Sequence, residues 1–172
     1  MPLTPPVTSS DHIRGGADWT VTLVEYGDYE CPACGQAHLV VKQLQSLLGS
    51  QLRFVFRNFP LKNTHPHAEE AAWLAESARS AGEFWGLHDL LFESQGQLDR
   101  SSLARYGIAR GMSQAQVKAA LSGIWRLKVA DDFGSGVRSG VTGTPTFFVD
   151  GKRFDGDWSL PGLLQALEAA AA

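Results

Sequence analysis

Two cysteines, Cys31 and Cys34, are the sulfur nucleophiles of this 172-residue chain, and two residues separate them. A pair at this spacing can make and break a disulfide, hold a metal, or staple one helical turn. A structural zinc ion needs four ligands, and the close histidines His65 and His67 do not have zinc-finger spacing. Two inert, buried thiols would explain neither the spacing nor the sequence around it. The pattern therefore favours thiol–disulfide chemistry and predicts no metal site.

The stretch DYECPACGQ, residues 28–36, follows a predicted strand and opens a predicted helix. The first turn of a helix carries unpaired N–H groups and a partial positive charge, and both stabilise a thiolate. Pro32 suits this turn because its missing N–H is not needed there. We therefore expect Cys31 to be the exposed nucleophile. Cys34, one turn further, is expected to be the buried thiol that resolves a mixed disulfide formed on Cys31.

Composition limits the classes of partner. The net charge is −3 with a pI near 5.9, and no basic cluster indicates a nucleic-acid or membrane partner. No apolar run approaches the roughly eighteen residues of a membrane-spanning helix. The N-terminus has no apolar core typical of a secretory signal, so we expect a cytoplasmic protein, or an exported one if a signal has been removed.

The first third of the chain predicts a loose arm followed by a β-α-β unit. Residues 1–18 are rich in Pro, Ser, Thr and Gly and predict a flexible arm. Residues 19–29 read as a buried central strand, and residues 51–60 read as a second strand with alternating large apolar side chains. Between them, apolar residues at helical spacing predict a helix that ends at Gly49.

The middle of the chain, residues 63–139, predicts a helical insertion. One helix is expected to continue to Gly82. Asp99 can cap a later helix, and Ser113 with Gln116 has the spacing of a capping box. The absence of a β pattern in this span separates it from the segments on either side.

The last third returns to strands. Residues 145–149 and 152–155 read as two short strands around Asp150-Gly151, a dipeptide typical of a type I′ hairpin. Ser159 is expected to cap a last, leucine-rich helix. The predicted order is therefore β-α-β, then several helices, then β-β-α.

This order and several motifs resemble the thioredoxin superfamily, and more closely its DsbA-like branch of thiol–disulfide oxidoreductases. The resemblance runs from about Asp18 to the C-terminus and rests on five stretches: VTLVEYGDYECPAC, FVFRNFPL, HPHAEEAA, EFWGLHDLLFE and GVTGTPTFFVDG. It implies an α/β thioredoxin fold formed by residues 19–62 and 140–172, with the helical insertion between them.

The resemblance also implies two further features of the site. The family places an acid on the first strand, six residues before the nucleophile, and here that residue is Glu25. A buried carboxyl group there would have a raised pKa and could carry the proton of the resolving thiol; the alternative is a partly exposed acid at a strand end. Thr144 and Pro145 match the family's cis-proline, beside which the backbone pairs with substrate.

Two residues depart from the family pattern. The residues between the cysteines are Pro32 and Ala33, whereas strongly oxidising DsbA-type proteins usually have Pro-His. Ala33 offers no imidazole to the Cys31 thiolate, and Glu30 adds a negative charge beside it, although a solvated Glu30 would be screened. We therefore expect a less oxidising pair than the DsbA archetype.

Together these features predict a monomeric thiol–disulfide oxidoreductase that acts on protein thiols and disulfides and is recycled by a redox partner. Its redox group is the Cys31–Cys34 disulfide, with no other cofactor. The alternatives are a non-catalytic thioredoxin-like binding or chaperone module, and an isomerase or transferase on the same fold. His38 and His88 are interpreted as surface or packing residues.

Overall fold

The computed structural model describes residues 1–78 and 83–172. A five-stranded mixed sheet lies at its centre, in the order β1-β3-β2-β4-β5. The strands are β1 (His12–Arg14), β2 (Val21–Gly27), β3 (Leu52–Asn58), β4 (Thr146–Val149) and β5 (Lys152–Phe154). The architecture is the α/β thioredoxin fold expected from the sequence.

The central strand β2 pairs with β3 on one side and with β4 on the other. It runs parallel to β3, with Glu25 opposite Phe56, and antiparallel to β4, with Glu25 opposite Phe147. All seven residues of β2 are buried, so the prediction of a buried central strand is confirmed. Fully burying a side chain such as Leu23 of β2 contributes about 1.5–3 kcal/mol, and this burial holds in place the strand that leads to the cysteines.

The N-terminal segment differs from the expected loose arm. Residues 12–14 form β1, which pairs antiparallel with β3, and Leu3 is buried. The guanidinium of Arg57 on β3 donates to the carbonyls of Pro5 and Pro6 and to both carboxylate oxygens of Asp11. A buried arginine needs these acceptors, and the polar, Pro-rich segment supplies them, which composition alone did not reveal.

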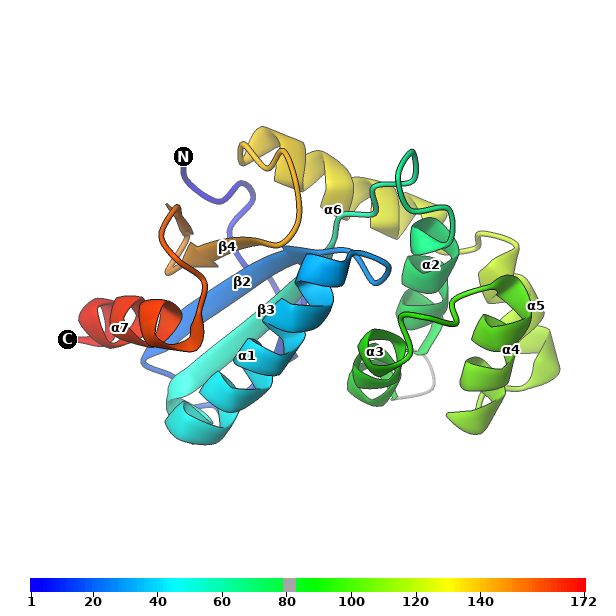
Figure 1. Cartoon of the computed structure of the whole chain (residues 1–172), viewed down its shortest axis with the longest axis horizontal. Helices are drawn as coiled ribbons and strands as arrows, with labels where there is room; N and C mark the ends of the chain where they lie inside the picture. The colour runs from blue at the N-terminus through cyan, green and yellow to red at the C-terminus, as the bar shows by residue number, and fades with distance from the viewer. Residues whose placement is uncertain (79–82) are drawn as a thin grey trace.

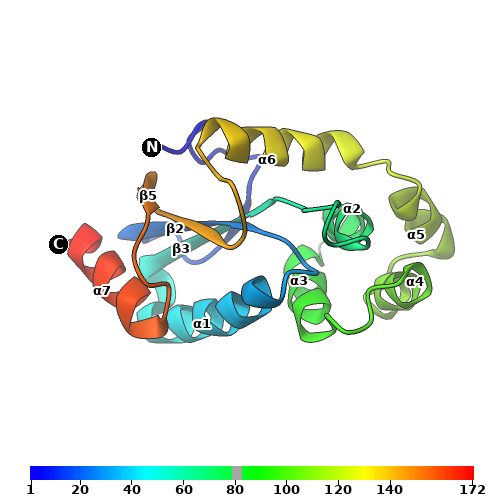
Figure 2. The ribbon, with the colours of Figure 1, turned by 45° about the horizontal axis from the view of Figure 1, so that its top comes forward.

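Helices cover both faces of the sheet. Figure 2 shows α1 (Pro32–Leu48) and α7 (Leu160–Ala171) on one face and α6 (Arg126–Arg138) on the other. The remaining helices stand together beyond the ends of β2 and β3 (Figure 1); they are α2 (Ala68–Ala78), α3 (Phe84–Glu93), α4 (Arg100–Ala109) and α5 (Gln114–Leu121). A 3₁₀ turn, η1 (Gly49–Gln51), joins α1 to β3.

The helices α2–α6 all fall within residues 63–139, the span of the expected insertion. Their local signals act as predicted, because Asp99 accepts from two backbone amides at the start of α4 and Ser113 forms a reciprocal capping box with Gln116. The predicted continuation of α2 to Gly82 lies outside the described residues.

The hairpin and the last helix follow their sequence signals. Asp150 and Gly151 both have positive φ, as a type I′ turn between β4 and β5 requires. The Ser159 hydroxyl accepts from the backbone amide of Gly162 at the start of α7. Both predictions are confirmed.

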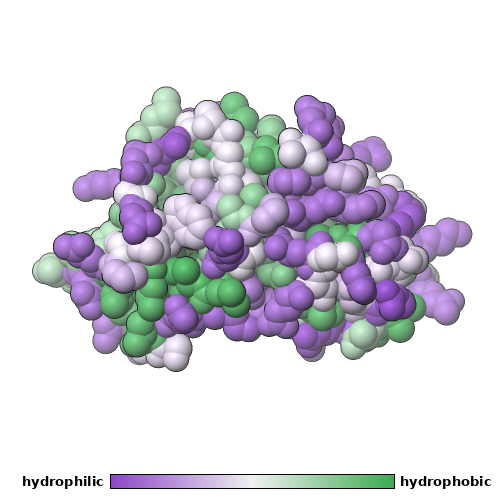
Figure 3. Space-filling model, in the orientation of Figure 1, coloured by the Kyte–Doolittle hydropathy of each residue, from purple (hydrophilic) through white to green (hydrophobic). Residues whose placement is uncertain are grey.

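The surface has both hydrophobic and hydrophilic regions. In the view of Figure 3, hydrophobic colour gathers over α1 and α7, where Leu39 and Leu47 of α1 are exposed. The helices on the opposite side of that view are mainly hydrophilic. Within the described residues, no helix combines the length and apolar character needed to cross a bilayer.

Candidate active site

The two cysteines lie at the start of α1, just beyond the end of β2. Cys31 is the N-cap, with extended backbone, and Pro32 is the first helical residue. Cys34 has no exposed surface, and Cys31 retains 7%, so the predicted order of exposure holds although Cys31 is far less exposed than expected. Both thiols are free in this structure.

Hydrogen bonding and burial give the two thiols very different pKa values. Hydrogen bonding from the Cys34 side chain is the largest cause that lowers the pKa of Cys31, and together with Thr144 and the backbone amides of Ala33 and Cys34 it brings this pKa to about 5 against the opposing effect of burial. Burial raises the pKa of Cys34 far above that of an ordinary thiol, and its hydrogen bond to Cys31 and the nearby Glu25 act in the same direction. Cys31 is therefore the thiolate at neutral pH.

The loop after α3 supports the turn that carries Cys31. The amide nitrogen of Gln95 donates to the carbonyl oxygens of Tyr29 and Cys31, at 2.9 and 2.8 Å. Its side chain lies so close to Gly35 that a Cβ at that position would be 2.1 Å from Oε1. Sequence reasoning missed Gln95, because nothing in a lone glutamine sixty residues away signals this contact.

Thr144 and Pro145 lie directly against the redox pair. The Thr144–Pro145 peptide bond is cis, and the Sγ of Cys31 is 3.5 Å from the carbonyl oxygen of Thr144. Pro145 precedes β4, so the strand starts at Thr146 without a proline inside its ladder. The structure thus brings together the cysteines and the proline loop, which are more than a hundred residues apart in the sequence.

Glu25 is buried behind the cysteines, with 1% of its surface exposed. Among the residues that the structure describes, its Oε1 has no hydrogen-bond partner. Burial raises the pKa of Glu25 to about 8, and the charge of Cys31 adds to the shift. The carboxyl group is therefore mostly protonated at neutral pH, unlike a partly exposed acid at a strand end.

Glu30 has a structural partner. Its Oε2 accepts a 2.6 Å hydrogen bond from the backbone amide of His67, just before α2. Asp28, which sequence reasoning missed, is also buried and accepts from the backbone amides of Glu30 and Leu61. These acids fasten the turn before Cys31 to the segment that leads into α2.

Two histidines lie in the aromatic core beside α1. His88 is buried and its Nδ1 is 3.0 Å from the hydroxyl of Tyr29. His38 is buried as well, so of the two interpretations, surface or packing, packing is confirmed for both histidines; α3 covers that side of α1. Burial lowers the pKa of both imidazoles, and that of His88 falls well below its ordinary value. Both are neutral packing residues at pH 7.

Within the described residues, one group of three potential metal ligands approaches closely: His38, His88 and Asp89, with ligand atoms within 4.8 Å of one another. It contains neither cysteine. Arg14 donates to both carboxylate oxygens of Asp89, so an arginine already engages this carboxylate.

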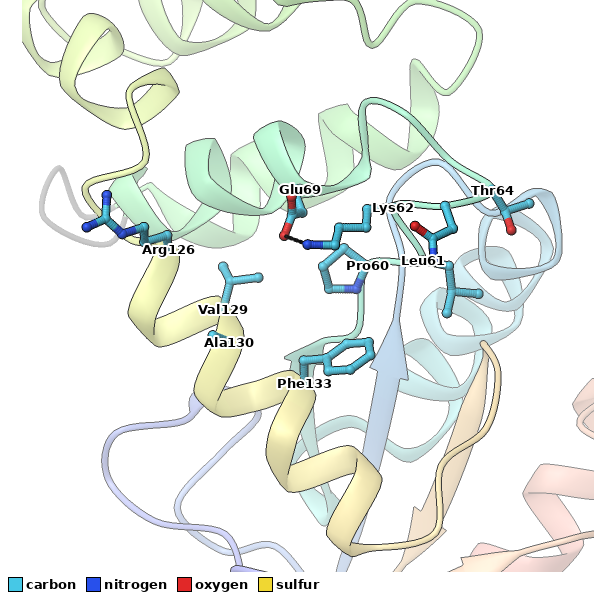
Figure 4. A pocket seen from close by; sticks show the side chains of 10 residues that line it. Pro60, Leu61, Lys62, Thr64, Glu69, Arg126, Val129, Ala130 and Phe133 are labelled. Carbon is cyan, nitrogen blue, oxygen red and sulfur yellow. Dashed lines mark ion pairs between the residues drawn. The ribbon is translucent and has the colours of Figure 1, made fainter.

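A groove of about 400 Å³ lies between α6 and the segment after β3 (Figure 4). Pro60, Val129 and Phe133 give it an apolar lining, and Lys62 forms an ion pair with Glu69 at its rim, at 3.6 Å. Neither cysteine lines it.

Comparison with known proteins places this geometry in a family. A family model described as thioredoxin matches residues 8–169. Relatives of similar sequence include the Na⁺/H⁺ antiporter NhaA 1 of Salinispora arenicola, 39% identical over 94% of this chain, and the antiporter NhaA of Herminiimonas arsenicoxydans, 38% identical over 99%. The chain spans about a quarter of the length of these relatives, at 25% and 27%.

Solved structures share the fold over nearly the whole chain. BdbD from Bacillus subtilis matches with a TM-score of 0.86 and 20% identity, covering 96% of this chain and 95% of that one. A thioredoxin-like oxidoreductase from Silicibacter pomeroyi matches with a TM-score of 0.83 and 24% identity, covering 95% and 93%. Wolbachia pipientis α-DsbA1 matches with a TM-score of 0.82 and 18% identity, covering 96% and 92%. The chain belongs to the thioredoxin family, with the DsbA-like form of the thioredoxin fold.

Proposed function

We propose that the chain is a thiol–disulfide oxidoreductase that exchanges its Cys31–Cys34 dithiol and disulfide with protein substrates. The observation that carries the proposal is the contrast between the two thiols at the start of α1. Cys31, with a pKa of about 5, is a thiolate at neutral pH, whereas burial keeps Cys34 protonated. Exchange requires this combination of a ready nucleophile and a protected resolving thiol.

In the reductive direction, the Cys31 thiolate attacks one sulfur of a substrate disulfide. A Cys31–substrate bond forms, the substrate S–S bond breaks, and the released sulfur leaves as a thiolate that takes a proton. Cys34 then loses its proton and attacks the Sγ of Cys31, which releases the second substrate thiolate and closes the Cys31–Cys34 disulfide. The substrate disulfide gains two electrons and the enzyme dithiol loses two; oxidation of a substrate dithiol is the reverse.

Glu25 is the proposed proton acceptor for Cys34. The thiol is fully buried, so its proton needs a nearby group, and Glu25 lies close enough for its charge to affect the pKa of Cys34. A carboxyl group with a pKa of about 8 exchanges protons readily near neutral pH. Glu25 accepts the proton in its ionised form and returns it in the reverse direction.

The backbone before Pro145 is the proposed contact for the substrate chain. The carbonyl of Thr144 already lies 3.5 Å from the sulfur of Cys31. A substrate segment that brings its cysteine to Cys31 therefore passes beside this loop, where extended backbone can pair with it.

The proposed activity does not include cation transport. The curated relatives are named as antiporters, but this chain corresponds to about a quarter of their length. Within the residues described, none of the helices has the length and apolar character of a membrane span. We therefore assign the matched quarter to thiol–disulfide exchange.

The expected redox potential is intermediate. A Cys31 pKa of about 5 lies between about 7 for thioredoxin and about 3.5 for DsbA. The reduction potential should therefore fall near the middle of the range between about −270 mV and about −120 mV. The residues around Cys31 alone would place it nearer the less oxidising, thioredoxin end.

The test is reduction of insulin by dithiothreitol, followed by turbidity. The wild-type chain is expected to accelerate precipitation of the insulin B chain, and Cys31→Ser to abolish the acceleration. A non-catalytic binding module would leave the rate at that of dithiothreitol alone, and this result would reject the proposal.

A further inference from the structure

His65 is held beside the redox turn by a buried acid. It lies in the segment between β3 and α2, and its Nδ1 is 2.8 Å from Oδ2 of Asp28. Asp28 has 1% of its surface exposed, and its other oxygen accepts from the backbone amide of Glu30 at 2.8 Å. The backbone carbonyl of Asp28 accepts from the amide of Cys31 at 3.2 Å. One residue therefore contacts both His65 and the nucleophilic turn.

Further bonds fix the two segments against each other. The carboxylate of Glu30 accepts from the amide of His67, and Oδ2 of Asp28 accepts from the amide of Leu61. The segment carrying His65 is thus fastened to the turn of Cys31 on both sides of the histidine. A side chain held this way keeps a fixed position relative to the Cys31 sulfur, which a freely rotating surface histidine would not.

The surroundings of His65 favour its charged form. Burial opposes the charge, but the hydrogen bond and charge of Asp28 outweigh it and raise the pKa of His65 above its ordinary value. The Cys31 thiolate and Glu30 act in the same direction. The largest electrostatic contributions at His65 therefore come from Asp28 and Glu30 on the turn and from the thiolate at its end, which are anions.

We propose that His65, oriented by Asp28, supplies the positive charge that stabilises the Cys31 thiolate in place of the imidazole missing at Ala33. His65 acts across space from the next segment of the fold, and Asp28 is its positioning residue. The residue between the cysteines therefore does not set the redox character of this protein alone. The inference rests on the proposed function for its consequence in catalysis, but the coupling itself is a property of the folded chain.

Coupling between two titrating groups is reciprocal. If the imidazolium lowers the pKa of Cys31, the thiolate must raise the pKa of His65 by the same amount. Closing the Cys31–Cys34 disulfide removes the negative charge of the thiolate. The pKa of His65 is therefore expected to fall when the protein is oxidised, and this change needs no mutation to observe.

The first measurement is an NMR titration of the His65 ring in wild-type protein reduced with dithiothreitol and oxidised with excess oxidised glutathione. The second follows the thiolate absorbance of Cys31 against pH in wild type, His65→Gln and the matched control His67→Gln. His67 meets the turn through its backbone amide, which the control preserves. At intermediate screening, loss of the imidazolium is expected to raise the pKa of Cys31 by about one unit, a tenfold change in thiolate equilibrium.

The expected result is a lower pKa of His65 in the oxidised protein and a raised pKa of Cys31 in His65→Gln but not in His67→Gln. An unchanged pKa of His65 between the two redox states would overturn the proposal, as would equal effects of the two substitutions. A chain that shows the coupling but fails to accelerate insulin reduction would contradict the proposed function and leave this inference intact.

Discussion

Two buried glutamates in this chain have pKa values that are shifted in opposite directions. Glu25 on β2 and Glu76 on α2 have 1% and 0% of their surfaces exposed. Burial raises the pKa of Glu25 to about 8. Burial also acts on Glu76, but hydrogen bonding from His12 and the charges of His12 and Lys128 outweigh it and lower its pKa. The same side chain at the same depth is therefore mostly neutral at one site and ionised at the other.

The difference comes from the partners. Oε2 of Glu76 is 2.9 Å from the Nε2 of His12, and Oε1 accepts from Asn58 at 2.7 Å with Lys128 at 3.8 Å. Oε1 of Glu25 has no hydrogen-bond partner within residues 1–78 and 83–172. The pairing of Glu76 ties β1, β3, α2 and α6 together, whereas the isolation of Glu25 leaves a carboxyl group that can change protonation near pH 7. Burial with partners serves stability here, and burial without them serves proton transfer.

The largest effect is expected from breaking the paired site. Glu76→Gln removes the buried charge that pairs with His12, while Lys128 keeps Asp132 at 2.6 Å, and should lower the free energy of unfolding by about 4 kcal/mol at pH 7. Urea denaturation measures the change. Glu69→Gln on the same helix is the matched control, because its ion pair with Lys62 lies at the surface and should be worth less than about 1 kcal/mol. Equal losses in the two variants would contradict the comparison.

At Glu25 the pH dependence of stability should have the opposite sign to that of a glutamate with a lowered pKa such as Glu76. The folded pKa of Glu25 lies above its ordinary value of 4.5, so the native state binds more protons between pH 4.5 and about 8. Stability from this group is complete below pH 4.5 and is lost as pH rises through 8. Glu25→Gln has no such loss, so its stability relative to wild type should increase by about 3 kcal/mol from pH 5 to pH 8.

This measurement uses the disulfide form, in which neither cysteine titrates. Burial, the larger cause of the raised pKa of Glu25, remains in that form, whereas the charge of Cys31 does not. Urea denaturation of both proteins at several pH values gives the slope. A difference between wild type and Glu25→Gln that stays constant with pH would show that Glu25 is ionised throughout, and the contrast with Glu76 would disappear.

The same substitution should slow exchange. A glutamine cannot accept the proton of Cys34, so resolution of mixed disulfides should fall by roughly tenfold or more at pH 7. Stopped-flow oxidation of the reduced protein by a peptide disulfide measures the step. The attack by Cys31 on the peptide should keep its rate, because the thiolate is already formed. Equal slowing of both steps would assign Glu25 a structural role instead.

Most of the fold follows from local sequence signals. The buried run of β2, the capping box at Ser113 and the turn at Asp150-Gly151 each predicted the element that the structure contains. These signals work because strand burial, capping and turn geometry depend on residues close together in the chain. The redox pair is equally local, since Cys31 and Cys34 are one helical turn apart.

The features that sequence reasoning missed depend on distant contacts. β1 forms in a segment with a loop-like composition because β3 and Arg57 provide its partners. Gln95 and His65 come from separate loops and contact the turn that carries Asp28 and Cys31, and the local sequence does not predict these contacts. Such residues become visible when the fold brings their segments together.

A smaller effect is expected when a second partner is added at the site. Ala33→His places an imidazole beside Cys31 and should lower the pKa of Cys31 by about one unit, which corresponds to a potential about 30 mV higher. Equilibration with a glutathione buffer measures the potential. Because His65 already provides a positive charge in our account, the added imidazole should have a larger effect in His65→Gln than in wild type. An unchanged or raised pKa in Ala33→His would mean that position 33 does not influence the thiolate.

The most direct test of the account is the acidity of Cys31 itself. Thiolate absorbance of the reduced protein, followed from pH 3 to pH 10 and compared with Cys31→Ser, isolates this one group. We expect a single transition near pH 5 that is absent in Cys31→Ser, with Cys34 remaining protonated throughout. A transition near pH 9, as for an ordinary thiol, would contradict the claim that this turn holds a ready nucleophile.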